Sequence, residues 1–204
     1  MTEEPLAIVV DDDDGLRDAI ADLLRSDGIE CITFGSTQAF LRHPLDDRPG
    51  CIILDVQLPD LSGLELQEHL LAIDQQMPII FITGYGDVPT SVRAMKAGAV
   101  DFLSKPIESE ALLIAVQRAI DRDIARREVS ARLDAVVAMV RSLSPREREV
   151  MDLVAQGLLN KQIAYMLGVS EITVKLHRGS MMKKMRSNSI IELIRRIEMV
   201  RDHL

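Results

Sequence analysis

The chain has 204 residues, of which 47% are hydrophobic and 27% are charged, and its formal net charge is −8. This composition is ordinary for a globular protein of one or two domains and excludes a disordered or fibrous chain. No apolar run approaches the roughly 20 residues that span a bilayer, and the first residues lack the basic segment of a signal peptide. Cys31 and Cys51 lie in apolar segments without metal-ligand spacing. We therefore expect reduced thiols, no membrane association and a cytoplasmic protein.

The charge is divided unevenly along the chain. Residues 1–142 carry 13 Lys and Arg against 25 Asp and Glu, whereas residues 143–204 carry 11 against 7. An acidic front and a basic back indicate two domains with different partners. The acidic part suits a metal ion or a basic partner, and the basic part suits a polyanion.

The first 121 residues alternate apolar strand-like runs with helical patterns. The expected strands are residues 6–10, 29–34, 50–54, 77–83 and 100–103. A helical segment follows each of them, and the last such helix opens at Glu108. Five alternating units of this kind predict a doubly wound α/β domain, with a parallel sheet and helices on both faces.

Polar side chains stand at the ends of four of these strands. Asp11 and Asp12 follow the first strand, Asp55 the third, Thr83 ends the fourth, and Lys105 follows the fifth. The carboxyl ends of parallel strands share one sheet edge, so we expect these groups to lie together. Clustered carboxylates repel one another unless a cation is bound, and hard oxygen ligands suit Mg²⁺. A carboxylate beside Mg²⁺ can attack phosphorus in line and form an acyl phosphate, which the lysine and the hydroxyl would stabilise.

Each of these residues also has a purely structural interpretation. Asp55 fits a turn or helix cap about equally well, Thr83 fits a β-branched strand end, and Lys105 fits a loop before proline. A phosphohydrolase with an aspartate nucleophile would use the same groups. That alternative is disfavoured because Gln57 stands where a general-acid aspartate would be expected, two residues after Asp55.

The motifs around these positions resemble the receiver domain of two-component response regulators. They are Val9-Val10-Asp11-Asp12-Asp13, Leu54-Asp55 with Leu58-Pro59-Asp60 and Gly63, Ile82-Thr83-Gly84, and Phe102-Leu103-Ser104-Lys105-Pro106. The resemblance implies a flavodoxin-like (CheY-like) five-stranded sheet in the order 2-1-3-4-5. It implies a sensor histidine kinase as phosphodonor and Asp55 as acceptor.

The same resemblance implies the roles of the neighbouring residues. Mg²⁺, for which Mn²⁺ is expected to substitute, would bind Asp12, Asp55 and the backbone carbonyl of Gln57, with Asp11 acting through water. Thr83 and Lys105 would contact the phosphoryl group, and Phe102 would be the aromatic switch. No enzymatic activity is expected beyond self-phosphorylation and autodephosphorylation.

Residues 107–144 contain neither Gly nor Pro, and their apolar positions follow helical spacing with a polar gap at Arg126-Arg127-Glu128. The pattern predicts a helical linker at residues 122–142, between a receiver domain at 1–121 and a second domain at 143–204. A dimerising coiled coil is the alternative. The apolar seam is short and broken, which favours the plain linker.

The second domain is predicted to hold four helices. Their predicted N-caps are Ser144, Asn160, Ser170 and Ser189. Ser144 and Glu147 form a capping box with Pro145 at the first helical position, and Gly157 and Gly168 end the first two helices. A helix, a glycine turn and a second helix at this spacing are typical of a helix-turn-helix.

The third of these helices is predicted to have two different faces. If Val174 faces the core, Met181 and Met185 share its side. The residues that then point away are Ile172, Lys175, Leu176, Gly179 and Lys183. An exposed leucine between lysines suits the DNA major groove, where lysine contacts guanine edges or phosphates and leucine contacts a thymine methyl. A solvated face with one stray apolar residue is the alternative.

The back of the chain resembles the LuxR-type helix-turn-helix, and the whole chain resembles FixJ/NarL-type response regulators. The resemblance lies in Leu143-Ser144-Pro145-Arg146-Glu147, Asn160-Lys161-Gln162-Ile163-Ala164 and Thr173-Val174-Lys175-Leu176-His177-Arg178. It implies a small all-α domain with base contacts from Lys175 and Leu176, and phosphate contacts from Lys161, Thr173 and Arg178. Lys183 on the same exposed face completes the predicted DNA-binding set.

Two stretches depart from this resemblance. Gly179 stands where some relatives carry a base-contacting lysine, and Met185-Arg186-Ser187-Asn188-Ser189 differs from the usual turn. The predicted protein is a transcription regulator that binds a double-stranded DNA operator as a phosphorylation-promoted homodimer, through its fourth back-domain helix. DNA binding that is independent of phosphorylation is the remaining alternative.

Overall fold

The computed structural model describes residues 4–84 and 88–201. It divides into two compact units, Met1–Arg127 and Glu128–Leu204. The boundary falls inside one helix, α5 (Ser109–Arg141), which runs without a break through the segment that the sequence assigns to the linker.

The first unit contains a five-stranded parallel sheet in the order β2-β1-β3-β4-β5. Its strands are β1 (Leu6–Val10), β2 (Glu30–Phe34), β3 (Gly50–Asp55), β4 (Ile79–Thr83) and β5 (Asp101–Ser104). The predicted flavodoxin-like order is confirmed, β1 has the expected limits, and the limits of the other strands differ from the expected ones by one or two residues. Every residue of β1, β3 and β4 is buried, as expected for strands that helices cover on both faces.

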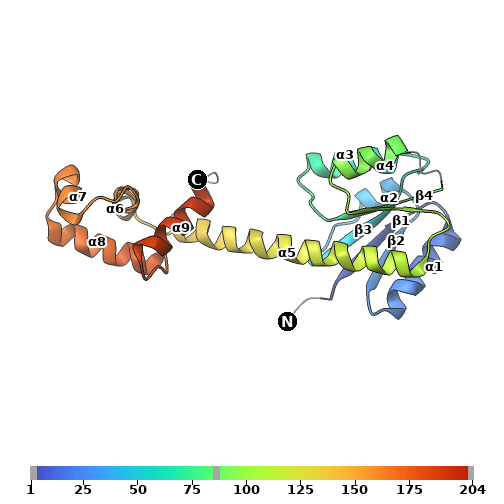
Figure 1. The fold of residues 1–204 in the computed structure, drawn as a ribbon, viewed down its shortest axis with the longest axis horizontal. Coiled ribbons are helices and arrows are strands. Elements are labelled where there is room, and N and C mark those ends of the chain that lie inside the picture. Colours follow the sequence, from blue (N-terminus) through green and yellow to red (C-terminus); the bar gives the residue numbers. More distant parts are fainter. Residues whose placement is uncertain (1–3, 85–87, 202–204) are drawn as a thin grey trace. The chain divides into compact units, whose positions relative to one another are not determined.

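Two helical layers enclose the sheet (Figure 1). The helices α1 (Asp14–Ser26) and α5 cover one face, where Leu24 and Val116 belong to the same core as Val9. The helices α2 (Thr37–Leu41), α3 (Gly63–Ala72) and α4 (Val88–Lys96) cover the other, where Phe40 and Leu66 belong to the core of Ile8 and Val10. The alternation of side chains along each strand therefore divides the apolar core into two halves.

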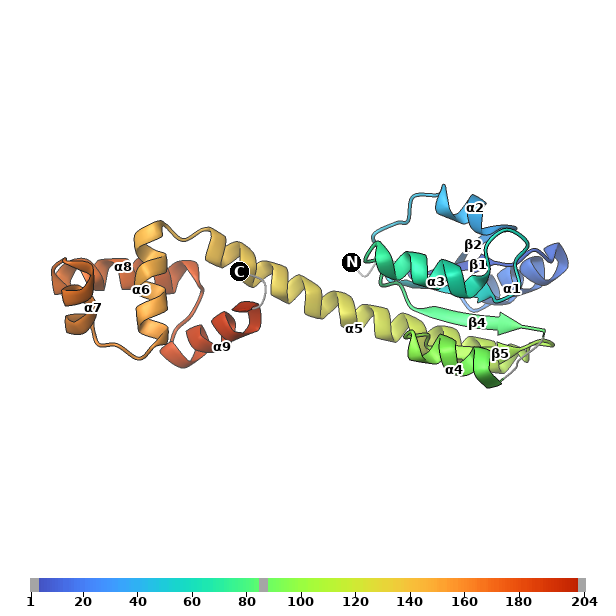
Figure 2. The ribbon, with the colours of Figure 1, turned by 90° about the horizontal axis from the view of Figure 1, so that it is seen from above.

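The second unit is helical. It contains the end of α5 together with α6 (Pro145–Ala155), α7 (Asn160–Leu167), α8 (Glu171–Lys184) and α9 (Ile190–Val200). Figure 2 shows α6 crossing α8. The shared core includes Val150, Ile163, Val174 and Leu193, and Val140 of α5 belongs to it. The predicted small all-α domain is thus present.

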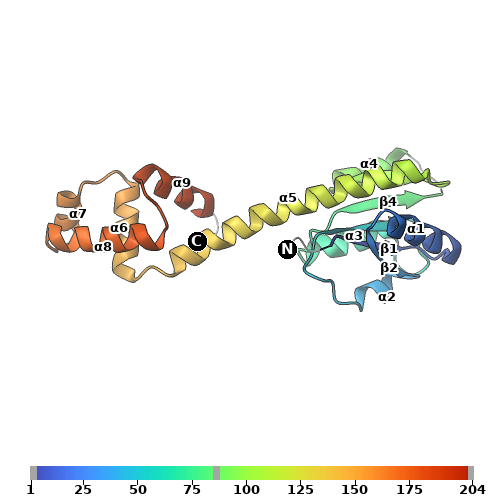
Figure 3. The same ribbon diagram turned by 90° about the horizontal axis from the view of Figure 1, so that it is seen from below.

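Three of the four predicted helix caps in this unit are observed. The hydroxyls of Ser144, Ser170 and Ser189 each accept a hydrogen bond from the backbone N–H three residues later. The prediction for Asn160 is wrong: Leu159 occupies the N-cap position, and its N–H donates to Gln162 Oε1 at 2.8 Å. Figure 3 shows α7 and α9 next to opposite ends of α8.

Within residues 4–84 and 88–201, no helix combines the length and the apolar character that a membrane crossing requires.

Candidate functional site

The carboxyl ends of β1, β3 and β5 bring predicted site residues together. Lys105 Nζ lies 2.8 Å from Asp11 Oδ2 and 2.6 Å from Asp55 Oδ2. One carboxylate oxygen from each of Asp11, Asp12 and Asp55 lies within 4.8 Å of the other two. We call Asp11, Asp12, Asp55 and Lys105 the acid cluster.

The members of the acid cluster differ in their exposure to water. Asp11 is fully buried and Asp55 is 4% exposed, whereas Asp12 is exposed. Burial, with a smaller contribution from the charge of Asp55, raises the pKa of Asp11, and together they outweigh Lys105 and the Asp13 amide, which lower it. Burial lowers the pKa of Lys105, but its bonds to Asp11 and Asp55 outweigh that effect and raise the pKa. Lys105 therefore remains a cation between two carboxylates at neutral pH.

Backbone N–H groups fix the orientation of the two buried carboxylates. Asp55 Oδ1 accepts from the N–H of Gln57 at 2.9 Å, and Asp11 Oδ1 accepts from the N–H of Asp13 at 2.8 Å. Each side chain thus has one oxygen held by its own strand-end turn and the other directed at the Lys105 ammonium.

Two further residues position the acid cluster, and the sequence analysis did not assign them this role. A Cβ at Gly63 would lie 2.3 Å from the backbone oxygen of Asp55, so only glycine lets α3 begin this close to β3. Arg17 Nη1 donates to the backbone oxygen of Asp11 at 2.6 Å. In the sequence, Gly63 stood out only as part of the receiver motif, and Arg17 gave no signal because its contact depends on the packing of α1.

Thr83 and Phe102 come from the adjacent strands β4 and β5. Thr83 is fully buried at the end of β4, and its backbone oxygen accepts from the N–H of Lys105 at 2.7 Å. Phe102 pairs in register with Phe81, and their ring centroids are 6.3 Å apart. Thr83 therefore lies at the sheet edge that holds Lys105, while the half-buried Phe102 ring belongs to the core under α4.

The acid cluster has the chemistry of a divalent-cation site. Three carboxylates face one ammonium, so the cluster keeps an excess of negative charge that burial makes costly. Carboxylate oxygens in an incomplete cage are the ligands that Mg²⁺ prefers, because it retains several waters. The residues present thus fit a hard divalent cation.

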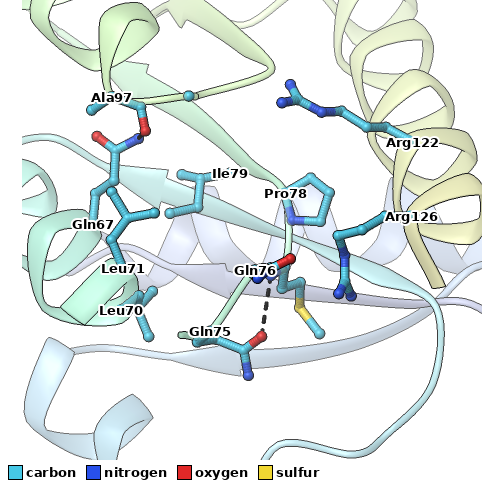
Figure 4. A pocket seen from close by; sticks show the side chains of 12 residues that line it. Gln67, Leu70, Leu71, Gln75, Gln76, Pro78, Ile79, Ala97, Arg122 and Arg126 are labelled. Atoms are coloured by element: carbon cyan, nitrogen blue, oxygen red, sulfur yellow. Dashed lines mark hydrogen bonds between the residues drawn. The ribbon is translucent and has the colours of Figure 1, made fainter. Parts of the chain in front are cut away.

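The first unit also has a cavity of about 240 Å³ at the opposite edge of the sheet (Figure 4). Its lining includes Arg122, Arg126, Gln67 and the residues that lead into β4. It contains no carboxylate and none of the predicted site residues, so it is separate from the acid cluster.

In the second unit, α8 has the two faces that the sequence predicts. Val174, Met181 and Met185 are fully buried. The exposed residues Ile172, Lys175, Leu176, Gly179 and Lys183 form what we call the outer face of α8. The side chains of Ile172 and Leu176 are 71% and 70% exposed. This face thus combines lysine ammonium groups with apolar surface in water and contains no carboxylate.

The three predicted phosphate contacts lie in different settings. Lys161 is exposed in the first turn of α7. Thr173 is partly buried, and its hydroxyl lies 2.9 Å from that of Ser170. Arg178 Nη1 donates to Asn160 Oδ1 at 2.7 Å, which ties α8 to the start of α7. Arg178 thus has a structural bond that the sequence did not reveal.

Glu147 holds α6 against α8. Its carboxylate is buried and accepts from the Ser144 N–H at 2.7 Å, the Ser180 hydroxyl at 2.5 Å and Lys184 Nζ at 2.7 Å. The Lys184 ammonium, with the Ser180 and Ser144 donors, lowers the pKa of Glu147 to about 2. The capping role was predicted from sequence, but the ion pair with Lys184 was not.

Comparison with known proteins identifies the family. The model of the "Response regulator receiver domain" family matches residues 7–117, which is more than half of the chain. The chain is a response regulator. The model of "Bacterial regulatory proteins, luxR family" matches residues 141–197 of the same chain. This response regulator therefore joins a receiver domain to a LuxR-type DNA-binding domain and regulates transcription.

Relatives resemble this response regulator over nearly its whole length. Nodulation protein W of Bradyrhizobium diazoefficiens is 50% identical over 193 residues, which cover 95% of this chain and 85% of the relative. Transcriptional regulatory protein FixJ of Azorhizobium caulinodans is 43% identical over 188 residues, covering 92% and 89%.

Solved structures give the same result. The response regulator StyR superposes with a TM-score of 0.88 at 44% identity, covering 96% of this chain and 98% of that one. Full-length FixJ from B. japonicum superposes with a TM-score of 0.58 at 39% identity, and both chains are covered completely.

Proposed function

We propose that Asp55 accepts a phosphoryl group from a sensor histidine kinase and that this modification controls DNA binding by the second domain. An oxygen of the Asp55 carboxylate attacks the phosphorus, and the bond from phosphorus to the donor nitrogen breaks. The product is an acyl phosphate, and the donor leaves with its electron pair. The observation that carries the proposal is the Lys105 ammonium, 2.6 Å from Asp55 and 2.8 Å from Asp11.

Lys105 and Thr83 are proposed to contact the transferred group. The ammonium already faces Asp55, so it can stabilise the negative charge that develops on the phosphoryl oxygens without a large rearrangement. The hydroxyl of Thr83 comes from the adjacent strand end. Its movement towards the phosphoryl group would alter the end of β4 and, through the paired strand β5, the surroundings of Phe102.

Mg²⁺ is the proposed cofactor, and Mn²⁺ is expected to substitute for it. Asp12, Asp55 and the backbone carbonyl of Gln57 would hold the ion, with Asp11 acting through water. Bound there, the ion would balance the charge of the carboxylates and of the incoming phosphoryl oxygens. Support comes from the excess of carboxylates over ammonium groups in the acid cluster.

The outer face of α8 is the proposed DNA-reading surface. Lys175 and Leu176 would contact base edges, with Lys183 on the same face. Lys161, Thr173 and Arg178 would contact phosphates. In support, Lys161 and Thr173 lie in the first turns of α7 and α8, where the helix dipole favours anions.

Regulation is proposed to act through assembly. Phosphorylation would favour a homodimer, in which the DNA-binding domains of both protomers bind one double-stranded operator. Once one domain is bound, the other binds at a high effective concentration, which raises the overall affinity. In this proposal the receiver comprises residues 1–121, the linker residues 122–142, and the DNA-binding domain residues 143–204. The chain would have no turnover beyond its own phosphorylation and dephosphorylation.

The acceptor assignment is tested by labelling full-length protein with radioactive acetyl phosphate. Wild type and Asp22→Asn are expected to incorporate acid-stable, base-labile label in the presence of Mg²⁺ and to lose it in excess EDTA. Asp22 is the matched control because it is an exposed aspartate of α1 whose ion-pair partner is the exposed Arg25. Asp55→Asn is expected to remain unlabelled. Labelling of Asp55→Asn at the wild-type rate would overturn the assignment.

A further inference from the structure

Gly179 has no structural reason to be glycine. It lies in the interior of α8, where glycine costs about 0.8–1.0 kcal/mol relative to alanine. Its φ is not positive, unlike those of Gly157 and Gly168, which end helices. Among residues 4–84 and 88–201, and apart from the adjoining backbone of α8, a Cβ added at Gly179 would meet no atom within 4 Å, whereas one at Gly50 or Gly63 would collide with backbone. Neither backbone conformation nor packing within the chain therefore explains this residue.

The neighbours of Gly179 on α8 indicate which kind of group could approach its backbone. Gly179 lies on the outer face of α8, one turn after Lys175 and Leu176 and one turn before Lys183. The Leu176 side chain is 70% exposed beside the bare backbone. Leu176 is apolar and Gly179 adds no side chain, so the two positions give an apolar stretch of helix surface with a lysine on either side along the helix, and we call this stretch the notch. A glycine at such a place lets another molecule approach the backbone closely.

We propose that Gly179 is a specificity-determining residue, and that the notch formed by Gly179 and Leu176 receives the C5-methyl group of one thymine in each operator half-site. The methyl group is the only apolar group that a base presents in the major groove, and it matches an apolar notch between cations. The adjacent lysines contact acceptors on flanking bases or phosphates. This inference rests on the proposed DNA-binding role of the outer face of α8.

The proposal predicts opposite effects of Gly179→Ala on stability and on binding. Alanine is expected to raise the thermal midpoint of the second unit, because it removes the helix cost of glycine and its Cβ meets nothing. The side-chain methyl group of the alanine would occupy the notch in place of the thymine methyl group, so the affinity for the operator is expected to fall. A residue that were merely tolerated on a solvated surface would give the stability gain alone.

The test uses full-length protein and the duplex that wild type enriches from a randomised DNA pool. Each thymine of that duplex is replaced in turn by deoxyuridine, which lacks only the methyl group. For one thymine position in each half-site, the replacement is expected to weaken wild-type binding about fourfold. That factor corresponds to the free energy of burying one methyl-sized group. Gly179→Ala is expected to bind the thymine duplex more weakly and to be insensitive to that same replacement. The other thymines serve as internal controls.

Two outcomes would overturn the proposal. One is an unchanged operator affinity of Gly179→Ala, and the other is an identical deoxyuridine profile in wild type and variant. The variant Lys175→Ala distinguishes these two outcomes from a failure of the proposal that the outer face of α8 binds DNA. If Lys175→Ala also binds as wild type does, the outer face of α8 is not the DNA-binding surface at all.

Discussion

Asp123 is a fully buried carboxylate on α5 that the acid cluster does not use. Its Oδ1 accepts from Arg126 Nε at 3.0 Å and Nη2 at 2.7 Å. Its Oδ2 accepts from Arg127 Nε at 2.8 Å and from the N–H of Gly50, the first residue of β3, at 3.1 Å. The side chain therefore joins α5 to the start of the strand that ends in Asp55.

Replacing Asp123 by alanine should destabilise the receiver unit strongly. Removing one partner of a buried ion pair costs about 3–5 kcal/mol. The arginine side chains are 32% and 24% exposed, so water can partly solvate them, and the low end of that range applies. We expect a loss of about 3 kcal/mol, which corresponds to a fall of roughly 10 °C in the midpoint of thermal unfolding.

Calorimetry of the full-length chain measures this effect. Only the transition of the first unit is expected to shift, because the second unit has a separate core. The matched control is Asp121→Ala, since Asp121 is exposed on the same helix and its carboxylate accepts from the exposed Gln117. Its expected cost is below about 0.5 kcal/mol. Equal shifts for the two variants would refute the reasoning.

Three further predictions concern other parts of the chain. Glu147→Gln should destabilise the second unit by about 1–3 kcal/mol. Because the pKa of Glu147 falls from 4.5 to about 2 on folding, its stabilisation is complete above about pH 4.5 and is lost towards pH 2. Urea midpoints of wild type and variant should therefore converge in acid, and a gap independent of pH would contradict this. Gly63→Ala should slow labelling of Asp55 by acetyl phosphate, and a wild-type rate would show that the close approach is unnecessary. Lys161→Ala should weaken binding to all duplexes alike and reduce the salt slope by about 1, whereas an unchanged slope excludes a phosphate contact.

The sequence predicted the parts of the fold that follow from local patterns. The continuous apolar runs became buried strands, and their alternation with helices determined a parallel sheet whose carboxyl ends share one edge. Because these strand ends share one edge, Asp11, Asp55 and Lys105 lie together, although Asp11 and Lys105 are 94 residues apart in the sequence. The two faces of α8 followed in the same way from helical periodicity.

The contacts that the sequence did not reveal join elements with no periodic relation to one another. The bond between Asp123 and Gly50 spans 73 residues, and that between Glu147 and Lys184 spans 37. Charged residues of this kind look like solvated surface until the packing of helices is known. The prediction that Asn160 caps α7 failed for a related reason, because Leu159 takes the N-cap position and the Asn160 side chain accepts from Arg178 of α8 instead.

The central claim is that phosphorylation of Asp55 controls DNA binding, and operator affinity measured with and without a phosphodonor tests it most directly. Full-length wild type and Asp55→Asn are titrated with the enriched duplex in Mg²⁺, with and without acetyl phosphate. We predict that acetyl phosphate raises the affinity of wild type on the order of tenfold, a typical coupling between two sites, and leaves Asp55→Asn unchanged. Equal affinity of wild type with and without the donor, or the same rise in Asp55→Asn, would contradict the claim.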